Sequence, residues 1–245
     1  MELSTIIIVG ASSGIGAALA QALAQPGRTL GLVARRPAEL AAVAAQVTAL
    51  GATAVVRPCD AADLSAVGAC WQDLLAQLGS CDALVYSAGV MPDVGPSEFD
   101  SVKDRHIIEV NVIGAMAWLN CGATYMQERK RGVLCGISSV AGDRGRRMAP
   151  AYAASKAALN TYLEALRNRL SVQGVSVATI KPGPVRTPML AGRKLPLTVD
   201  AAVAARRIAL ALHRGEHTVY VHWGYRAIMG IISCIPSFIF RRLAI

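Results

Sequence analysis

The chain has 245 residues, of which 53% are apolar and 17% are charged, and a chain of this length and composition can bury one sizeable core. Its net charge is +9, but the arginines that dominate it are scattered and no aromatic residues are interleaved with them, which argues against nucleic-acid binding. None of the six cysteines belongs to a Cys-x-x-Cys pair, which argues against zinc or dithiol sites and favours a reduced, cytoplasmic setting.

The N-terminal segment Met1–Gly10 predicts a first buried strand. Its apolar run, Ile6–Val9, is shorter than the core of a signal peptide and leads into a helix-like pattern without a cleavage site. We therefore expect no secretion signal in this segment.

Beyond it, short runs rich in Val and Ile alternate with long runs rich in Ala and Leu. Strands are predicted at 5–10, 29–35, 52–58, 82–89, 132–139, 175–182 and 218–222, and helices at 14–25, 38–49, 63–78, 101–129, 151–172 and 198–213. Continuous apolar strands are covered on both faces, which is typical of a parallel sheet. We predict one Rossmann-type, doubly wound α/β domain at 1–222, with a mainly parallel seven-stranded sheet flanked by helices, and an apolar helical tail at 223–245.

The stretch VGASSGIGAALA (9–20) places Gly10, Gly14 and Gly16 between the first strand and the first helix. Glycines let the backbone approach a pyrophosphate, and a helix N-terminus offers it free amides. Ser12 and Ser13 add hydroxyl donors. A tight turn without a ligand and a methyltransferase loop stay open as alternatives, but the position directly after the first strand favours a dinucleotide.

The second strand ends with Arg35 and Arg36, where NAD enzymes usually carry an acid for the ribose 2′-hydroxyl. Arginine suits a 2′-phosphate instead, so we expect NADP(H) to be preferred over NAD(H). The alternative is that one or both arginines only begin a solvent-exposed helix and bind no cofactor. Asp60, beside Ala61, is placed to bind the adenine amino group. It could equally cap the helix that begins near Leu64.

In AYAASKAALN (151–160), Tyr152 and Lys156 are four positions apart and therefore share one face of a helix. A free phenol has a pKa of about 10, and a nearby cation lowers it. The pair is either a surface contact or an acid tuned by its neighbour.

These motifs occur in the order typical of the short-chain dehydrogenase/reductase family, which the sequence resembles over nearly its whole length. The matching residues are Gly10-Ala11-Ser12-Ser13-Gly14-Ile15-Gly16, Ser87-Ala88-Gly89, Asn111, Ser139, Tyr152, Lys156 and Pro182-Gly183. The resemblance implies a nicotinamide cofactor, hydride transfer between a carbonyl and an alcohol, and a homodimer or homotetramer. A non-catalytic NADP-binding sensor is the alternative from another functional class.

The resemblance also assigns catalytic roles. Tyr152 would protonate the carbonyl oxygen, while Lys156 would lower its pKa and bind the nicotinamide ribose. Ser139, in preference to Ser138, would orient the substrate oxygen. Asn111 would distort the long helix and hold a water that relays protons.

Further residues follow the sixth strand. Pro182 and Gly183 would turn the chain beneath the nicotinamide, and Val185 and Thr187 would contact its carboxamide. Residues 188–198 resemble a mobile substrate lid.

Two positions depart from the family pattern. Val9 replaces the usual Thr before the first glycine, and Tyr86-Ser87-Ala88-Gly89 replaces Asn-Asn-Ala-Gly. We expect these changes to affect cofactor affinity or strand support rather than the catalytic residues.

The tail WGYRAIMGIISCIPSFIFRRLAI (223–245) is almost wholly apolar from 227 to 240 and is bracketed by Arg226, Arg241 and Arg242. These fourteen residues, interrupted by Pro236, are too few to span a bilayer. Three interpretations stay open: a helix buried against the core or a second subunit, a peripheral contact with anionic headgroups at the inner face of the membrane, and a wall of the substrate pocket.

The stretches SSVAGDRGR (138–146) and KPGPVRTPM (181–189), together with the tail, resemble the branch of the family that contains decaprenylphosphoryl-ribose keto-reductases. This resemblance implies a hydrophobic or lipid-linked carbonyl substrate, such as a keto-sugar at the membrane surface. Arg144, Arg146 and Arg147 would then meet a phosphate or, equally, form a solvated surface.

Overall fold

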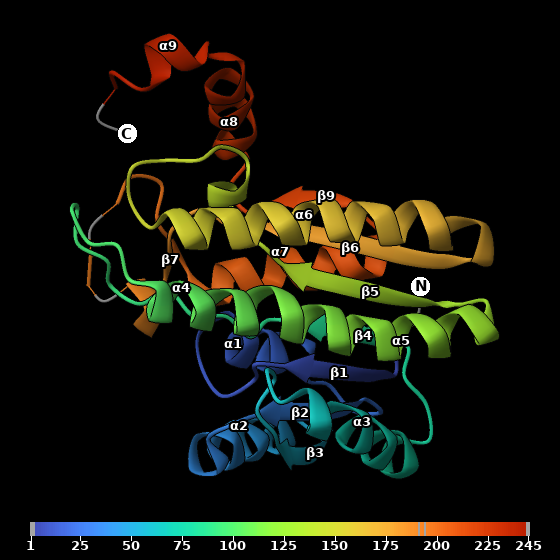
Figure 1. The fold of residues 1–245 in the computed structure, drawn as a ribbon. Coiled ribbons are helices and arrows are strands. Elements are labelled where there is room, and N and C mark those ends of the chain that lie inside the picture. Colours follow the sequence, from blue (N-terminus) through green and yellow to red (C-terminus); the bar gives the residue numbers. More distant parts are fainter. Residues whose placement is uncertain (1–2, 191, 194, 244–245) are drawn as a thin grey trace.

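The computed structural model describes residues 3–190, 192–193 and 195–243 (Figure 1). Its strands are β1 (Thr5–Val9), β2 (Thr29–Ala34), β3 (Thr53–Pro58), β4 (Ala83–Tyr86), β5 (Gly132–Ile137), β6 (Val175–Lys181), β7 (Val185–Arg186), β8 (Val199–Asp200) and β9 (Thr218–Tyr220). Its helices are α1 (Gly14–Leu23), α2 (Pro37–Ala49), α3 (Leu64–Leu78), α4 (Ser101–Ile108), α5 (Ala115–Arg129), α6 (Pro150–Leu170), α7 (Ala201–Arg214), α8 (Gly224–Cys234) and α9 (Ser237–Phe240). Four short turns of other helix types are η1 (Glu109–Gly114, a π-helix) and the 3₁₀ helices η2 (Val140–Gly142), η3 (Ser171–Gln173) and η4 (Pro188–Leu190).

Within the described residues, seven strands form one parallel sheet in the order β3-β2-β1-β4-β5-β6-β9. The strand order reverses between β1 and β4. At such a switch point the connections leave in opposite directions and open a crevice beyond the carboxyl ends of the strands. The predicted fold class and the seven-stranded parallel sheet are therefore confirmed.

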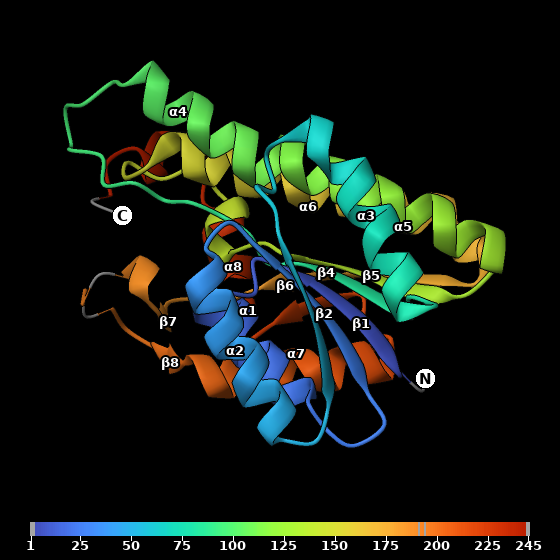
Figure 2. The same ribbon diagram turned by 90° about the horizontal axis from the view of Figure 1, so that it is seen from below.

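Helices cover both faces of this sheet (Figure 2). One face carries α3, α5 and α6, and the other carries α1, α2 and α7. Successive side chains of a strand point to opposite faces, so Ile6 and Ile8 of β1 pack in one core cluster while Ile7 and Val9 pack in the other. This explains why the strands are continuously apolar, and it makes the sheet a rigid base for the loops at its carboxyl edge.

The long helix predicted at 101–129 consists of α4, η1 and α5 in direct succession. By length and composition alone this run could cross a membrane, but half of its apolar window is buried inside the protein. Its middle turn is wider than the rest because η1 is a π-helix. The predicted distortion around Asn111 is therefore present.

Several predicted boundaries are shifted. Strand β4 ends at Tyr86, and β5 ends at Ile137, so Ser87–Gly89 and Ser139 lie in loops beyond the sheet edge. Helix α7 begins three residues later than predicted, at Ala201, because Val199 and Asp200 pair with β7. The predicted lid includes Ala191 and Lys194, and the tail ends at Ala244 and Ile245; these four residues lie outside the described part of the chain.

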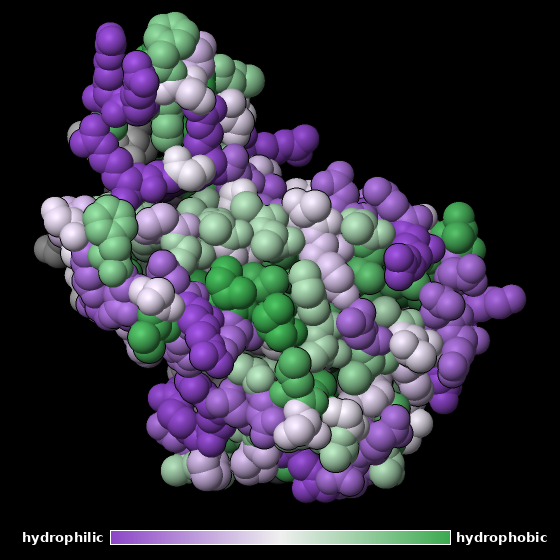
Figure 3. All heavy atoms as spheres, viewed as in Figure 1, coloured by the Kyte–Doolittle hydropathy of each residue, from purple (hydrophilic) through white to green (hydrophobic). Residues whose placement is uncertain are grey.

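The tail forms a C-terminal arm, which we define as residues 223–243. Helices α8 and α9 are separated at Pro236 and stand above the end of the sheet that carries the loops (Figure 1). Only Tyr225 and Met229 of α8 are buried, in a small cluster with Val140. The space-filling view shows hydrophobic and hydrophilic residues mixed on the protruding arm (Figure 3).

Candidate active site

The glycine-rich turn after β1 is shaped by close backbone contacts. Gly10 has a φ of +89°, and a Cβ there would lie 2.4 Å from the backbone nitrogen of Ala88. A Cβ on Gly16 would lie 2.1 Å from the carbonyl oxygen of Gly10. Only glycine fits these two positions. The turn therefore packs tightly between the start of α1 and the loop after β4.

The N-terminus of α1 faces this turn. Its N-cap residue, Ser13, makes no side-chain hydrogen bond to the first turn of the helix, so the leading amides of α1 are free to bind an anion. This cradle fits the pyrophosphate of a dinucleotide. Gly16 itself does not line the cavity described below; it serves the packing of helix on strand.

Two arginines follow β2 beside the glycine-rich turn. The Nη2 of Arg36 donates to the hydroxyl oxygens of Ser12 and Ser13, at 3.0 and 2.9 Å. The Nη1 of Arg35 lies 3.8 Å from the carboxylate of Asp60. Both guanidinium groups are half exposed, so they remain accessible to a phosphate.

The helix after β3 is capped by Asp63, not by Asp60. The Asp63 carboxylate accepts a hydrogen bond from the backbone nitrogen of Ser65, whereas Asp60 accepts one from the backbone nitrogen of Ala62, at 3.0 Å. The alternative interpretation of Asp60 as the N-cap is therefore wrong. Asp60 and Ala61 both line the cavity, as the adenine-site interpretation requires.

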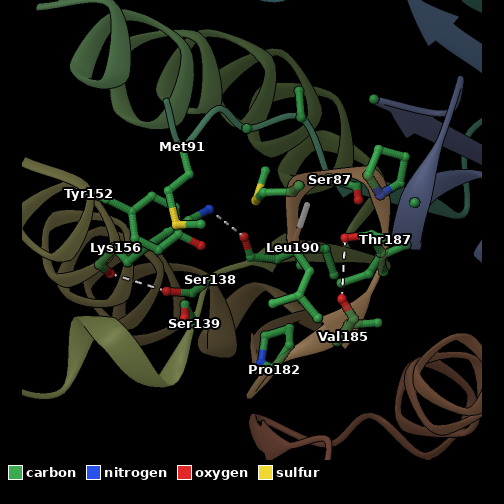
Figure 4. A pocket seen from close by; sticks show the side chains of 18 of the residues that line it. Ser87, Met91, Ser138, Ser139, Tyr152, Lys156, Pro182, Val185, Thr187 and Leu190 are labelled. Atoms are coloured by element: carbon green, nitrogen blue, oxygen red, sulfur yellow. Dashed lines mark hydrogen bonds between the residues drawn. The ribbon is translucent and has the colours of Figure 1, made fainter. Parts of the chain in front are cut away.

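Lys156 and Tyr152 project from the same face of α6 (Figure 4). The Lys156 ammonium is buried, donates to the carbonyl oxygen of Ile137 at 3.0 Å and lies 5.7 Å from the centre of the Tyr152 ring. Burial lowers the pKa of Lys156 to about 8. A buried amine on a cavity wall with a strongly lowered pKa is a candidate functional residue.

Ser139 lies beside this pair, just beyond β5 (Figure 4). Its hydroxyl caps η2 by accepting a hydrogen bond from the backbone nitrogen of Ala141, at 3.0 Å. Burial raises the pKa of Tyr152, and a hydrogen bond with Ser139 partly offsets the rise. The pKa of Tyr152 therefore lies above its ordinary value in the protein on its own, and its lowering by Lys156 stays a prediction.

Ser138 has a different environment from Ser139. It is buried, and its hydroxyl donates to the carbonyl oxygen of Lys156 at 3.1 Å. It therefore fixes α6 against the end of β5, and its proton is already engaged.

Asn111 lies behind the catalytic pair and not on the cavity wall. It is fully buried in η1, and its amide accepts from the backbone nitrogen of Val90 and donates to the carbonyl oxygen of Val90 and to Ser155. A Cβ on Gly89 would lie 3.3 Å from its Oδ1 and 3.6 Å from the Nζ of Lys156. Asn111 thus holds the loop after β4 next to Lys156.

The loop after β6 closes the other side of the site. The backbone nitrogen of Val140 donates to the carbonyl oxygen of Pro182 at 3.0 Å. A Cβ on Gly183 would lie 2.2 Å from the ring of Tyr225, so the arm packs directly on this loop. Val185 belongs to the short ribbon with β8, and the Thr187 hydroxyl donates to its carbonyl oxygen at 3.3 Å.

One cavity of about 810 Å³ joins these groups. Of the predicted site residues it is lined by Gly10, Ser12, Ser13, Gly14, Ile15, Arg35, Arg36, Asp60, Ala61, Ser87, Ala88, Gly89, Ser139, Tyr152, Lys156, Pro182, Gly183, Val185 and Thr187. In Figure 4, Tyr152, Lys156 and Ser139 gather on one side, and Ser87 and Thr187 lie on the other. The structure therefore brings the predicted catalytic and cofactor residues to one cavity, except for Gly16 and Asn111.

Apolar residues complete the cavity. Met189, Leu190, Leu195 and Pro196 come from the segment predicted as a lid and Tyr225 from the tail, whereas Met91 and Met148 lie in loops that no sequence motif singled out. Tyr225 comes from the arm, and its hydroxyl donates to the carbonyl oxygen of Pro196 at 3.0 Å. Of the three interpretations of the tail, the cavity wall applies to Tyr225, and packing against the rest of the protein applies to Tyr225 and Met229.

The three arginines after Ser139 mainly hold the arm. Arg144 donates to the carbonyl oxygens of Ile232 and Ser233 at the end of α8 and lies 4.5 Å from the centre of the Phe240 ring. Arg147 donates to the carbonyl oxygen of Arg241 at 3.1 Å. The expectation that all three meet either a phosphate or solvent is therefore wrong for Arg144, whereas Arg147 is exposed, as the solvated-surface interpretation expects.

Among the residues that the structure describes, no three His, Cys, Asp or Glu side chains lie close enough to hold a metal ion. The polar groups that line the cavity in this part of the chain are hydroxyl, ammonium, guanidinium and backbone groups and the carboxylate of Asp60.

Comparisons with known proteins agree with this geometry. The sequence pattern described as short chain dehydrogenase matches residues 4–196. An uncharacterized oxidoreductase of Streptomyces coelicolor is 34% identical over 243 residues, which cover 98% of this chain and 96% of the relative.

Two solved structures share the fold. A short-chain dehydrogenase from Sphingobium yanoikuyae in complex with NADPH has a TM-score of 0.82 and 25% identity, covering 96% of this chain and 97% of the other. A 3-oxoacyl-[acyl-carrier protein] reductase from Brucella melitensis with bound NAD has a TM-score of 0.78 and 27% identity, covering 89% and 88%.

Proposed function

The chain belongs to the short-chain dehydrogenase family and is an NAD(P)-dependent oxidoreductase; from this premise we propose that it uses NADPH to reduce the carbonyl group of a hydrophobic small molecule, with Tyr152 as the proton donor. The observation that carries the proposal is that Tyr152, Ser139 and Lys156 line the same cavity as the glycine-rich turn.

In this proposal each side chain has one task. Ser139 donates its hydroxyl proton in a hydrogen bond to the substrate carbonyl oxygen and so orients it. Tyr152 gives its phenolic proton to that oxygen. Because burial raises the pKa of Tyr152, the phenol is protonated at neutral pH and ready to act as an acid. A bound nicotinamide supplies the hydride.

Lys156 and Asn111 support this acid. We assign to Lys156 the binding of the nicotinamide ribose and the passage of protons toward Tyr152. Its charge is sustained below a pH of about 8. Asn111 fixes the Val90 backbone beside it, and we keep its assignment as the holder of a relay water.

The preference for NADP(H) rests on Arg35 and Arg36. They stand at the carboxyl end of β2 beside Ser12 and Ser13, and no carboxylate takes the position that would receive the ribose 2′-hydroxyl. A guanidinium group binds a phosphate with paired hydrogen bonds. Asp60 is assigned to the adenine amino group.

The substrate is proposed to be hydrophobic because methionine, leucine and proline side chains line the cavity beyond Tyr152.

We further propose that the arm touches an anionic membrane surface, where a lipid-linked carbonyl compound would be found. Ile231 and Phe238 of the arm are exposed, arginines flank them, and the sequence has no acidic residue after Glu216. Like other members of the family, the protein is expected to form a homodimer or homotetramer.

The direct test is the oxidation of NADPH, followed by its absorbance, with a panel of ketones and aldehydes of increasing apolar size. Turnover that rises with apolar size supports the proposal. The reverse reaction is tested with NADP and a panel of alcohols. Tight binding of NADPH without turnover in either direction would instead identify a dinucleotide sensor.

A further inference from the structure

Arg146 is the charged residue of the Ser139–Tyr152 loop that reaches the cavity. It lines the cavity, as Met148 and Tyr225 do, and it is partly buried. Its positive charge acts on the neighbouring Tyr225, because it partly offsets the rise in the Tyr225 pKa that burial causes. A guanidinium group therefore stands in a largely apolar part of the cavity.

The hydrogen-bond donors of the Arg146 guanidinium group lack good acceptors. Its Nη2 donates to the thioether sulfur of Met229 at 3.3 Å, and thioethers are weak acceptors. Its Nε is shielded from solvent and has no hydrogen-bond partner. Among the residues that the structure describes, no carboxylate forms a salt bridge with it.

The neighbouring arginines differ in this respect. Arg144 and Arg147 donate to backbone carbonyl oxygens of the arm. Arg193, which also lines the cavity, lies 3.2 Å from the carboxylate of Asp93. Of the guanidinium groups on the substrate side of the cavity, Arg146 is the one without an oxygen acceptor in the described part of the chain.

A partly desolvated cation without an acceptor costs free energy, and a bound anion removes that cost by supplying charge-assisted hydrogen bonds. Building on the proposed function, we propose that Arg146 forms an anion subsite, and that the carbonyl substrate is an apolar molecule carrying a carboxylate or phosphate group. The anion would bind the terminal nitrogens of Arg146, between the apolar side chains and the arm.

The phosphates of the dinucleotide do not account for this residue. Arg35 and Arg36 follow β2, whereas Arg146 follows β5, and β1 and β4 lie between these strands. Three strand spacings separate the two positions by about 14 Å. The glycine-rich turn follows β1, which is two strands away from β5. Arg146 therefore belongs to a different loop from the residues assigned to the dinucleotide phosphates.

The test uses the full-length protein saturated with NADP and measures binding by calorimetry. The ligands are octanoate, octyl phosphate and octanol, which share an apolar chain and differ in the head group. The anions are expected to bind about tenfold or more tightly than octanol, since a charge-assisted hydrogen bond contributes about 1.5–3 kcal/mol. The ratio of octanoate to octyl phosphate affinity identifies the preferred anion.

Three variants locate the effect. Arg146→Met should reduce the anion affinity about tenfold or more, Arg146→Lys should retain part of it, and Arg147→Met, which changes an arginine outside the cavity, should bind like the parent. Equal affinities for octanol and the anions, or equal losses in the Arg146→Met and Arg147→Met proteins, would overturn the proposal. If Arg146→Met lowers the melting temperature, the anion affinities of Arg146→Lys and Arg147→Met are compared instead. A lower affinity in Arg146→Lys than in Arg147→Met supports the proposal, and equal affinities overturn it.

This result is independent of turnover. Anion binding that depends on Arg146 would stand even if no carbonyl compound were reduced, which would refute the proposed function alone. Conversely, reduction of neutral and anionic ketones with equal efficiency, together with equal binding, would refute the subsite and leave the proposed function intact.

Discussion

The hydroxyl group of Tyr86 donates a 2.6 Å hydrogen bond to the carbonyl oxygen of Val110. Tyr86 ends β4, and Val110 lies in the π-helix directly before Asn111. The space for this hydroxyl depends on Gly114, where a Cβ would lie 2.9 Å from it. Tyr86, which departs from the family pattern, thus holds the π-helix η1, in which Asn111 lies.

Replacing Tyr86 by Phe removes this bond and leaves a buried carbonyl oxygen without its donor. We expect a loss of about 1–3 kcal/mol in the free energy of unfolding and a lower kcat, with NADPH affinity retained. Urea unfolding and steady-state kinetics measure both. Tyr162→Phe is the matched control, because its hydroxyl bonds to Asn120 at the surface; equal losses in the two variants would refute the role of Tyr86.

Lys156→Met should stabilise the protein without added cofactor while abolishing its activity. Burial lowers the pKa of Lys156 from 10.5 to about 8, which corresponds to a cost of about 3 kcal/mol in the folded state at pH 7. Between pH 8 and 10.5 the unfolded chain binds more protons at this site, so the parent gains stability as the pH rises. The advantage of the variant should therefore be constant below pH 8 and vanish by about pH 10.5.

Lys181→Met is the contrasting control for this measurement. Lys181 pairs with Asp143 at 2.6 Å, and both side chains are mostly buried, while Tyr220 donates to the same carboxylate. Removing the lysine leaves a buried carboxylate without its cation, which costs about 3–5 kcal/mol. Urea unfolding at pH 7 should therefore move in opposite directions for the two lysine variants; destabilisation by both would contradict the interpretation of Lys156.

Tyr152→Phe should bind NADPH as the parent does and show no turnover. The parent should reduce carbonyl compounds at a rate that is level from pH 6 to about 8 and declines above it, because Tyr152 keeps its proton while Lys156 loses its positive charge. Fluorescence titration of NADPH and kcat as a function of pH test the two statements. Residual turnover near the parental rate in the Phe variant would remove Tyr152 from the mechanism.

Local periodicity explains which parts of the site could be predicted. Tyr152 and Lys156 meet because four residues make about one helical turn, and the glycine-rich turn follows from the strand and helix on either side of it. Tyr225 and Pro196 meet because the arm packs on a loop 29 residues away in sequence, and no local pattern encodes that contact. Asp60 and Asp63 are only three positions apart, so local sequence does not show which of the two carboxylates caps the helix that begins at Leu64.

The same limit applies to the arginines. A sequence pattern shows that Arg144, Arg146 and Arg147 are clustered, but not that two of them donate to carbonyl oxygens of a segment about 90 residues later. The pKa of Tyr152 depends on its burial, which the spacing of Tyr152 and Lys156 does not reveal.

Arg35→Ala and Arg36→Ala should weaken NADPH binding about tenfold or more and leave NADH binding nearly unchanged, because the lost hydrogen bonds go to the 2′-phosphate. Titration of protein fluorescence with each dinucleotide measures this. Arg57→Ala serves as a control, since Arg57 pairs with Asp73 on α3 and does not line the cavity. Parallel losses for NADPH and NADH would place the two arginines at a part of the dinucleotide that both cofactors share.

The arm should bind vesicles that contain phosphatidylglycerol and not vesicles of phosphatidylcholine alone, because its exposed apolar side chains lie beside arginines that attract anionic headgroups. The double variant Ile231→Ser, Phe238→Ser should lose this binding and keep NADPH affinity, since both side chains are exposed, at 69% and 60%, and neither lines the cavity. Val172→Ser, at an 83% exposed position distant in sequence from the arm, controls for general loss of surface hydrophobicity. Cosedimentation measures the bound fraction, and binding that survives the double variant, or that is absent from the parent, would show that these side chains do not contact a membrane.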